Sequence, residues 1–455
     1  MKKYESDNIR NVGIFSHGGE GKTSIVEAML FLSGENNRLG RVDDGTSLMD
    51  YESEEVERKI TISSSLACFE WGKNKFNFID TPGDDNFIFD AKLCMRVLDA
   101  AVIVVSAVSG VKVGTEKVWQ YANEFSIPVC IFINKLDRER ADFERTVEDV
   151  QKNFTDTNPL VIQLPMGKEE SLRGVVDLLS MKAYVYKDDG SGGFDRIDIP
   201  SEFQAEANKY REKLVEIAVE MDDEVMERYL NGDEIKEEEI EKCLKDGIWT
   251  RRIAPIMCGS AAKNIGINTL LDNIVRCFPP PTYKNEVEGL DPKTGNTLKR
   301  KIKSDEPFSA FVFKTITDPF AGKLTLFKIY SGEIHPDMTV LNVSKDEKER
   351  IGQIFFLVGK KQKSAGFASA GDIAVLSKLK DVGTGDTLCD EKNPIKYKEV
   401  SISQPVISFS LQPKAKGDED KLNTSLARLI EEDQTIKYSR DEQTKEFILS
   451  GMGQV

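Results

Sequence analysis

Short runs of apolar residues alternate with amphipathic stretches from about residue 11 to residue 278. Five runs have the length of buried strands, and helical patterns separate most of them. They lie at residues 12–15, 76–79, 101–105, 128–133 and 253–257. This alternation is typical of a mostly parallel sheet covered by helices, so we predict an α/β domain over residues 1–282.

A long interruption separates the last two of these runs. It begins with a short apolar run and continues into a strongly acidic helical tract at residues 201–247. Ile235, Ile240 and Leu244 keep to one face of this tract among glutamates and lysines. We therefore expect an inserted α+β subdomain at about residues 159–250, with a solvated amphipathic helix to which we assign no chemistry.

Three consecutive prolines at residues 279–281 end this part of the chain, because they cannot continue a helix or enter a central strand. At residues 303–396, alternating segments are interrupted by glycines, which predicts a small antiparallel β-barrel. A strand and an amphipathic helix within residues 403–455 predict a partial α+β domain. Three domains fit the length, since single cores rarely grow past roughly 250–300 residues.

The composition restricts the classes of function. The 455 residues include 77 acidic and 62 basic ones, for a formal charge of -15, which argues against a surface that binds nucleic acid phosphates all over. Local basic patches remain compatible with that charge. The seven cysteines form no Cys-x-x-Cys pair, so we expect buried, reduced thiols. Without a signal peptide or a run of about 18 uncharged apolar residues, the chain is predicted to be cytoplasmic, with no membrane span.

A phosphate-binding loop lies between the first predicted strand and a helical stretch. It consists of Ser16, His17, Gly18, Gly19, Glu20, Gly21, Lys22 and Thr23, with Ser24 opening the helix. Glycines let consecutive N–H groups turn around a β-phosphate, Lys22 can bridge phosphate oxygens, and the Thr23 hydroxyl can bind Mg²⁺. Ser16 stands where the motif usually begins with glycine, and a glycine-rich turn without function is the alternative.

A second motif follows the apolar strand at residues 76–79 and consists of Asp80, Thr81, Pro82 and Gly83. The Asp80 carboxylate, at a strand end, can hold Mg²⁺ through water, and Gly83 can present its N–H to a γ-phosphate. Between the two motifs lies Thr61, which can reach Mg²⁺ and the γ-phosphate when GTP orders its segment. Taken alone, Thr61 would be an ordinary strand residue.

The choice of base depends on Asn134, Lys135 and Asp137, which follow the strand at residues 128–133. The Asp137 carboxylate can accept two hydrogen bonds from guanine N1 and N2, donors that adenine does not offer in that arrangement. Sites built on such pairing can discriminate by roughly 10⁴–10⁵. Asn134 would brace the loop, and the aliphatic stem of Lys135 would lie against the base.

A fifth element follows the last predicted strand and consists of Ser260, Ala261 and Ala262. Its backbone N–H groups would be offered to the guanine O6 atom. Each of the five elements is a common string by itself. All five occur in the order found in GTPases, at strand ends or in the loops between them, so we predict a GTP site.

Longer segments extend this pattern beyond the nucleotide motifs. They include residues 58–62, 163–167, 174–177, 258–261, 318–324, 330–332, 371–373, 385–388, 426–433 and 449–453. Together they resemble elongation factor G and its paralogues along nearly the whole chain. The resemblance implies a P-loop GTPase domain with an inserted subdomain, a β-barrel domain II and the beginning of domain III.

The same resemblance implies function. GTP and GDP with Mg²⁺ would be the ligands, ribosomal RNA and proteins the partners, and the factor would work as a monomer. Family members carry further domains that reach the decoding site and move tRNA and mRNA. We therefore expect a fragment of a longer protein that does not translocate by itself.

Two positions depart from the family pattern. Family members usually have a histidine directly after Asp-Thr-Pro-Gly, which the ribosome turns toward the attacking water, and here that position is Asp84. A charged carboxylate would repel the γ-phosphate, so we predict slow hydrolysis. In a second interpretation Asp84 points outward, and the ribosome or Asp85 replaces the histidine. Gly19 also replaces the usual aspartate, so a monovalent cation held there would be missing.

Three hypotheses about function follow. The first is a ribosome-dependent GTPase that supports translocation. The second is a GTP-dependent ribosome-binding regulatory or protection factor with little hydrolysis of its own, in which the nucleotide sets the shape of the switch segments. The third, an enzyme outside translation that borrows the GTPase domain, conflicts with the resemblance in the second and third domains. Both departures favour a divergent paralogue over the housekeeping factor.

Overall fold

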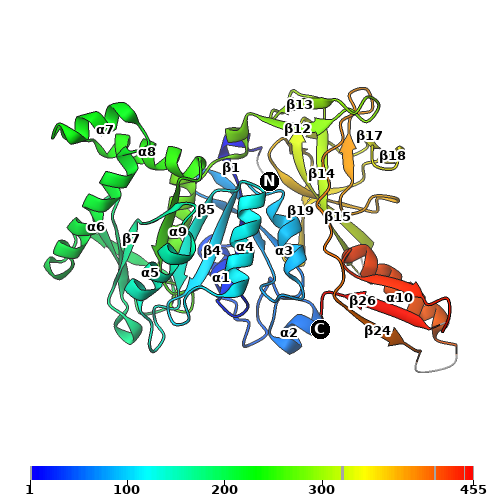
Figure 1. The fold of residues 1–455 in the computed structure, drawn as a ribbon, viewed down its shortest axis with the longest axis horizontal. Helices are drawn as coiled ribbons and strands as arrows, with labels where there is room; N and C mark the ends of the chain where they lie inside the picture. The colour runs from blue at the N-terminus through cyan, green and yellow to red at the C-terminus, as the bar shows by residue number, and fades with distance from the viewer. Residues whose placement is uncertain (1–2, 319–321, 414–416, 445, 454–455) are drawn as a thin grey trace.

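The computed structural model describes residues 3–318, 322–413, 417–444 and 446–453 (Figure 1). Part of the family-like segment at residues 318–324 and the last two residues, Gln454 and Val455, lie outside the described residues. The described chain has a central α/β part, a lobe of strands and helices on one side, and a β-rich part on the other (Figure 1).

The central sheet has the strand order β2-β3-β1-β4-β5-β11-β6. Its strands are β1 (Ile9–Phe15), β2 (Ser65–Trp71), β3 (Asn74–Asp80), β4 (Ala100–Ser106), β5 (Val129–Asn134), β6 (Asn158–Val161) and β11 (Ile253–Cys258). All neighbours pair in parallel except β2, which pairs antiparallel with β3. All residues of β1, β3, β4, β5 and β11 are buried, because helices cover both faces of the sheet. The predicted α/β architecture is confirmed.

Strand β2 was missing from the sequence prediction. It forms a hairpin with β3 through Gly72, whose φ of 60° is one that glycine adopts without strain. The six helices around the sheet are α1 (Lys22–Leu32), α2 (Ser53–Arg58), α3 (Ile88–Met95), α4 (Val113–Glu124), α5 (Phe143–Asn153) and α9 (Ile267–Cys277). The helix predicted after the phosphate loop corresponds to α1.

The lobe beside β6 lies where we predicted an insertion. Its antiparallel sheet contains β7 (Gln163–Met166), β8 (Gly174–Asp177), β9 (Lys182–Tyr186) and β10 (Phe194–Ile197), and its helices are α6 (Ser201–Val219), α7 (Asp223–Leu230) and α8 (Glu237–Trp249). The acidic tract is thus three helices. Ile240 and Leu244 are buried on α8, whereas Ile235 precedes that helix and is half-buried.

After a linker hairpin of β12 (Glu286–Leu290) and β13 (Thr297–Lys301), the chain forms an antiparallel barrel domain around its own apolar core. Its strands are β14 (Ser309–Asp318), β15 (Gly322–Ser331), β16 (Glu333–Ile334), β17 (Thr339–Asn342), β18 (Glu347–Arg350), β19 (Ile354–Val358), β20 (Lys361–Ala365), β21 (Ala368–Ser369), β22 (Ile373–Ser377) and β23 (Thr387–Cys389). A third unit packs helix α10 (Glu419–Glu432) beside a sheet of β24 (Ile407–Leu411), β25 (Lys437–Arg440) and β26 (Phe447–Gly451).

The barrel domain continues the central sheet. Val358 of β19 pairs with Ala67 of β2, and the Gly359 N–H donates to the Leu66 carbonyl at 2.9 Å. Behind this seam, the buried Lys75 ammonium lies 2.7 Å from a carboxylate oxygen of Asp372, across the two domains. In a second buried pair the lysine belongs to the barrel and the aspartate to the central domain. The Lys328 ammonium lies 3.0 Å from a carboxylate oxygen of Asp99. These two ion pairs connect the barrel to the central sheet.

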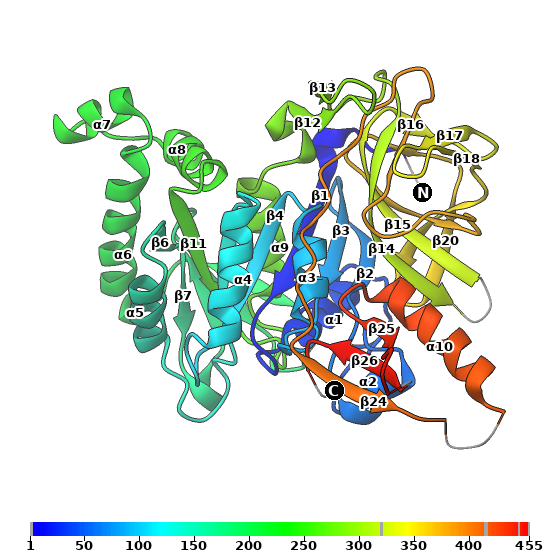
Figure 2. The same cartoon turned by 45° about the vertical axis from the view of Figure 1, so that its right-hand side comes forward.

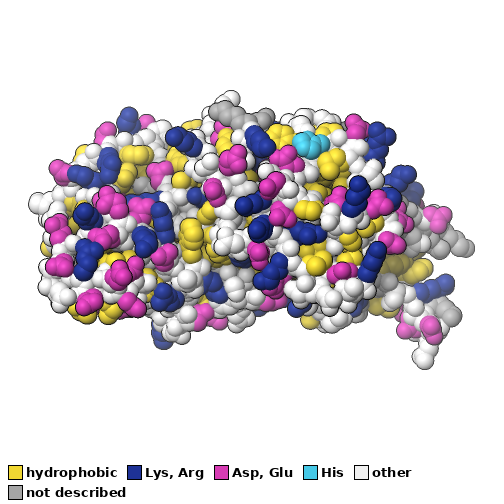
Figure 3. Space-filling view, turned by 90° about the horizontal axis from the view of Figure 1, so that it is seen from above, with side chains coloured by type: hydrophobic (Ala, Val, Ile, Leu, Met, Phe, Trp, Pro, Cys, Tyr) yellow, Lys and Arg dark blue, Asp and Glu magenta, His cyan; other side chains and the backbone are white. Residues whose placement is uncertain are grey.

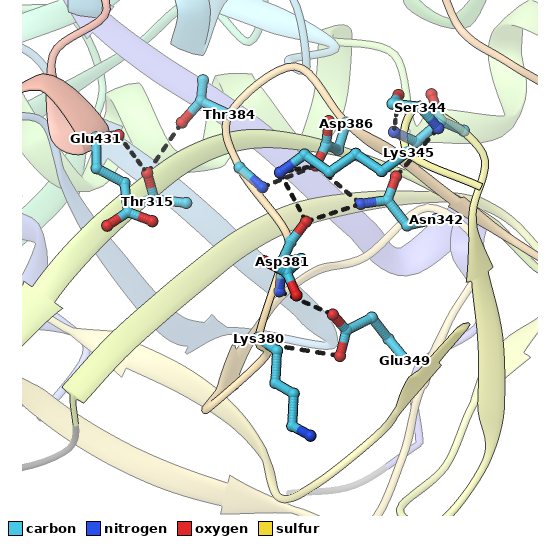
Figure 4. Close-up of polar contacts among 12 residues, drawn as sticks. Thr315, Asn342, Ser344, Lys345, Glu349, Lys380, Asp381, Thr384, Asp386 and Glu431 are labelled. Carbon is cyan, nitrogen blue, oxygen red and sulfur yellow. Dashed lines mark hydrogen bonds and ion pairs between the residues drawn. The ribbon is translucent and has the colours of Figure 1, made fainter. Parts of the chain in front are cut away.

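The third unit is attached to the barrel at the loop between β22 and β23 (Figure 4). The Thr315 hydroxyl lies 3.2 Å from the Thr384 hydroxyl and donates to the carbonyl of Glu431, near the end of α10, at 2.9 Å. Gln434 adds a hydrogen bond to the Thr384 carbonyl at 2.7 Å. In both views β26 lies near α2, so the third unit also approaches the central domain (Figures 1 and 2).

Surface and thiols give few further clues to function. Acidic and basic side chains are interspersed over the face seen in Figure 3. All seven cysteines are buried and free, as we predicted from their spacing. Among the described residues, no helix is both long enough and apolar enough to span a membrane.

Candidate functional site

A cavity of about 640 Å³ opens at the carboxyl ends of β1 and β3. Twelve of the residues proposed for the site line it, namely Gly18, Gly19, Gly21, Lys22, Thr23, Ser24, Thr61, Gly83, Asp84, Lys135, Ala261 and Ala262. They come from segments that are far apart in the sequence. The parallel sheet brings them together, because the carboxyl ends of parallel strands share one edge.

The phosphate loop turns directly into α1. Gly21 is the cap residue with φ of 97°, and Lys22 is the first residue of the helix. Gly83 lies against this loop so closely that a Cβ there would be 2.2 Å from the Lys22 ammonium and 2.9 Å from the Gly18 nitrogen. Both positions therefore need glycine, one for its backbone conformation and the other for the close approach.

Lys22 is buried and has only weak partners. Its ammonium donates to the Ser16 hydroxyl at 3.1 Å and to the His17 carbonyl at 3.3 Å. Burial lowers the pKa of Lys22 to about 8, although nearby Asp80 opposes this shift. An anion in the cavity would give this cation a strong partner and raise its pKa again.

Two carboxylates lie beside Lys22. Both oxygens of Asp80, at the end of β3, are buried without a hydrogen-bond partner, and so is Oδ2 of Asp50. The Thr61 hydroxyl donates to Asp50 Oδ1 at 2.9 Å and lies 3.0 Å from the Thr23 hydroxyl. Orphaned carboxylate oxygens beside two hydroxyls form the oxygen-rich set that Mg²⁺ prefers.

The pKa values of these two acids reflect their burial. Desolvation, followed by the charge of Glu55, raises the pKa of Asp50 to about 7. Desolvation, followed by the charge of Asp50, raises the pKa of Asp80 well above its usual value. Both carboxyl groups are thus costly to ionise without a cation. The residues present fit a divalent cation.

The other end of the cavity is braced by Asn134. Its Nδ2 donates to the Glu20 carbonyl at 3.0 Å, and its Oδ1 accepts from the Ala261 N–H at 3.0 Å. The Lys135 ammonium donates to the Gly19 carbonyl at 2.5 Å, so its stem crosses the cavity wall. One oxygen of Asp137 accepts from the Ser260 hydroxyl at 2.6 Å. This bond orients the Asp137 carboxylate.

Several proposed residues do not line the cavity. They are Ser16, His17, Glu20, Asp80, Thr81, Pro82, Asn134, Asp137 and Ser260. The Thr81 hydroxyl donates to the Ile14 carbonyl at 2.6 Å, and the Glu20 carboxylate pairs with Lys112 at 2.6 Å. These two side chains support the loops, so only their backbones remain available to a ligand.

Other residues that the sequence did not predict also line the cavity. They are Leu39, Gly40, Arg41, Val42, Asp43, Asp50, Lys59, Ile60 and Arg138. Most belong to the long polar segment between α1 and Thr61, in which no sequence motif or repeated spacing of residues indicates a site. The only local signal for Asp50 is an acidic residue directly after the apolar pair Leu48 and Met49.

Asp84 and Asp85 lie in the turn after Gly83. Asp84 borders the cavity, and its Oδ1 accepts two hydrogen bonds from Asn86. Asp85 is exposed and lies 2.9 Å from the Lys117 ammonium on α4. Asp84 therefore does not point fully outward, and Asp85 is engaged in an ion pair away from the cavity.

Comparisons with known proteins agree with this arrangement. The model of the elongation factor Tu GTP binding domain matches residues 7–280. Models of elongation factor G domain 2 and of its domain III match residues 307–391 and 402–455. The chain belongs to the elongation factor G-like translational GTPases.

Membership in this translational GTPase family also fits a solved structure. The chain is similar to a protein from Thermus thermophilus with a known crystal structure, at 28% sequence identity and a TM-score of 0.87. The match covers 98% of this chain and 64% of the other, so the chain spans less than two thirds of that relative. The GTPase domain of this family implies that the chain binds GTP and GDP.

Proposed function

We propose that this translational GTPase binds GTP with Mg²⁺ in the cavity and hydrolyses it slowly on the ribosome to support translocation. The observation that carries the proposal is the set of orphaned oxygens of Asp80 and Asp50 beside the weakly paired Lys22. Buried groups of opposite charge without good partners are costly unless a ligand completes them.

The chain's own residues would divide the work. Lys22 and the N–H groups of the phosphate loop would bind the β- and γ-phosphates. Thr23, Thr61 and Asp80 would hold Mg²⁺, which supplies neutralisation of the charge that develops on the phosphates. Gly83 would donate its N–H to the γ-phosphate.

Guanine would be selected at the other end. The Asp137 carboxylate would accept from guanine N1 and N2, and its bond from Ser260 keeps it oriented for this task. The N–H groups of Ala261 and Ala262 would face O6, and Lys135 would lie along the base. Asn134 already ties this loop to the phosphate loop, so the two ends of the site are held in register.

Slow hydrolysis follows from Asp84. Asp84 offers the attacking water no histidine, and from the edge of the phosphate site, where its turn holds it, the carboxylate repels the γ-phosphate only weakly. We expect GTP turnover that ribosomes stimulate and that Asp84→His accelerates by a factor of about ten or more. Multiple-turnover assays with and without ribosomes test this on both proteins.

Two results would contradict the proposal. If Asp84→His left ribosome-stimulated turnover unaltered, the proposal that Asp84 makes hydrolysis slow would be wrong. Tight GTP binding with no more than a few-fold stimulation by ribosomes would indicate a GTP-dependent ribosome-binding or protection factor. We further propose that the factor works as a cytoplasmic monomer and contacts ribosomal RNA and proteins, which sedimentation with ribosomes in GTP and GDP would test.

A further inference from the structure

The turn after Gly83 is closed by the side chain of Asn86. The Phe87 N–H donates to the Asp84 carbonyl at 3.0 Å, which closes a four-residue turn. Within it, the Asn86 backbone N–H and its side-chain Nδ2 both donate to Asp84 Oδ1, at 2.9 and 2.6 Å. One oxygen of Asp84 is thus held inside the turn, although the residue borders the cavity.

The other side of Asn86 faces the third unit. A Cβ on Gly453 would lie 1.5 Å from Asn86 Oδ1 and 2.7 Å from its Cγ, so a methyl group there would displace the Asn86 side chain. Gly451, two residues earlier, has no atom within 4 Å of such a Cβ. Asn86 therefore lies between Asp84 and Gly453, which follows β26. Its Nδ2 donates to Asp84, and its Oδ1 faces Gly453.

We propose that Asn86 is a positioning residue that keeps the Asp84 carboxylate in its turn and away from the γ-phosphate, and that Gly453 of the third unit holds Asn86 in place. Repulsion from a released Asp84 would fall mainly on GTP, because GDP lacks the γ-phosphate. The contact thereby favours GTP over GDP. This inference rests on the proposed GTP site.

The arrangement also couples the third unit to the nucleotide. A movement that withdraws Gly453 would release Asn86, free Asp84 to turn into the cavity and weaken GTP selectively. Linkage requires the reverse effect to be equally large, so bound GTP favours the docked third unit more than GDP does. Asn86 would thus connect the domain arrangement to the choice between the two nucleotides.

The first experiment measures dissociation constants for a non-hydrolysable GTP analogue and for GDP, by competition with a fluorescent guanine nucleotide. Asn86→Ala should weaken the analogue about tenfold and leave GDP within about twofold, as expected for a like charge brought several ångströms closer. In an Asp84→Asn background, Asn86→Ala should leave the ratio of the two constants unchanged. An equal effect in both backgrounds, or none in either, would overturn the inference.

A matched glycine pair tests the third unit. Gly453→Ala should shift the ratio in the same direction as Asn86→Ala, because the added methyl group displaces the Asn86 side chain. Gly451→Ala, where the methyl group meets open space, should behave as the unchanged protein. Equal ratios for Gly453→Ala and the unchanged protein would refute the role of Gly453. If the unchanged protein bound neither nucleotide, the proposed function itself would fail, so the two failures are distinguishable.

Discussion

The nucleotide cavity and the barrel loop at residues 380–386 are both rich in buried polar groups, but they differ in how those groups are paired. At the cavity and directly behind its lining, both oxygens of Asp80, one of Asp50 and the Nδ1 atom of His17 are buried without hydrogen-bond partners. In the loop, Asp386 Oδ2 accepts from the Gly383 N–H at 2.8 Å and from Asn342 at 2.9 Å (Figure 4).

Other polar groups of this loop also have hydrogen-bond partners. Glu349 accepts from the Asp381 N–H at 2.9 Å, and Lys345 donates to the Asp381 carbonyl at 2.7 Å. Among the described residues, no side chain of this network has a buried polar atom without a partner. The difference teaches that buried polarity alone does not mark a site. The unpaired carboxylate oxygens of Asp80 and Asp50 are the stronger signal, because a buried charge without a hydrogen-bond partner is costly unless a ligand completes it.

The largest expected effect comes from Asp80→Ala. It should lower affinity for GTP with Mg²⁺ by about 10³-fold, because a charged partner of the ligand is lost. The free protein should lose little stability, since the deleted oxygens accept no hydrogen bond and are attracted mainly by the charge of nearby Lys22. Fluorescent nucleotide titration and thermal unfolding without nucleotide measure the two quantities. A large loss of stability in the free protein would remove the contrast between the two regions.

Lys75→Met extends the comparison to a fully paired charge between the domains. Lys75 is buried between Asp372 and the Phe356 ring, whose centroid is 3.2 Å from the ammonium. Without the Lys75 ammonium, the negative charge of Asp372 would be buried without its partner. This should lower the free energy of unfolding by about 3 kcal/mol. Denaturant unfolding measures this, and the double variant with Asp372→Asn should recover part of the loss. No recovery would show that the pair itself is not the cause.

Asp386→Ala is the counterpart of Asp80→Ala in the satisfied loop. It removes the acceptor of two buried hydrogen bonds and should cost about 2 kcal/mol of unfolding free energy. Affinity for GTP should stay unchanged, because the loop lies in the barrel domain and does not line the cavity. Chemical denaturation and nucleotide titration of the same sample give both values. A matching loss of affinity would mean that the two regions are energetically coupled.

The smallest expected effect is that of Ser16→Ala. The Ser16 hydroxyl accepts from Lys22 at 3.1 Å, so its removal frees the ammonium for phosphate. Affinity for GTP should rise by no more than about threefold, which is less than one ordinary hydrogen bond contributes. Competition binding resolves this change. A severe loss would show that Ser16 supports the shape of the loop.

Local patterns predicted much of the fold. The apolar runs identified five of the seven strands of the central sheet, since a strand buried on both faces has a nearly continuous apolar sequence. Strand β2 was missed, and its place between β3 and β19 of the barrel is visible only in the folded chain. The acidic tract was correctly predicted as helical, but its division into α6, α7 and α8 depends on packing.

The candidate site was partly predictable for the same reason. Lys22 and Thr23 are neighbours in one loop, so their spacing is visible in the sequence. Asp50 was missed because it becomes part of the site only when Thr61 bonds to it and to Thr23 across the fold. Glu20 stood among the proposed ligands, yet its side chain pairs with Lys112.

The sequence by itself determined the α/β domain, the phosphate loop and the motif that we propose selects guanine, because each depends on neighbouring residues and their hydrogen-bonding groups. Only the tertiary structure decided which polar atoms are left unpaired, where the barrel joins the sheet, and that Asn86 lies between Asp84 and Gly453. Those features depend on contacts between residues far apart in the chain, and no local pattern encodes the distance between them.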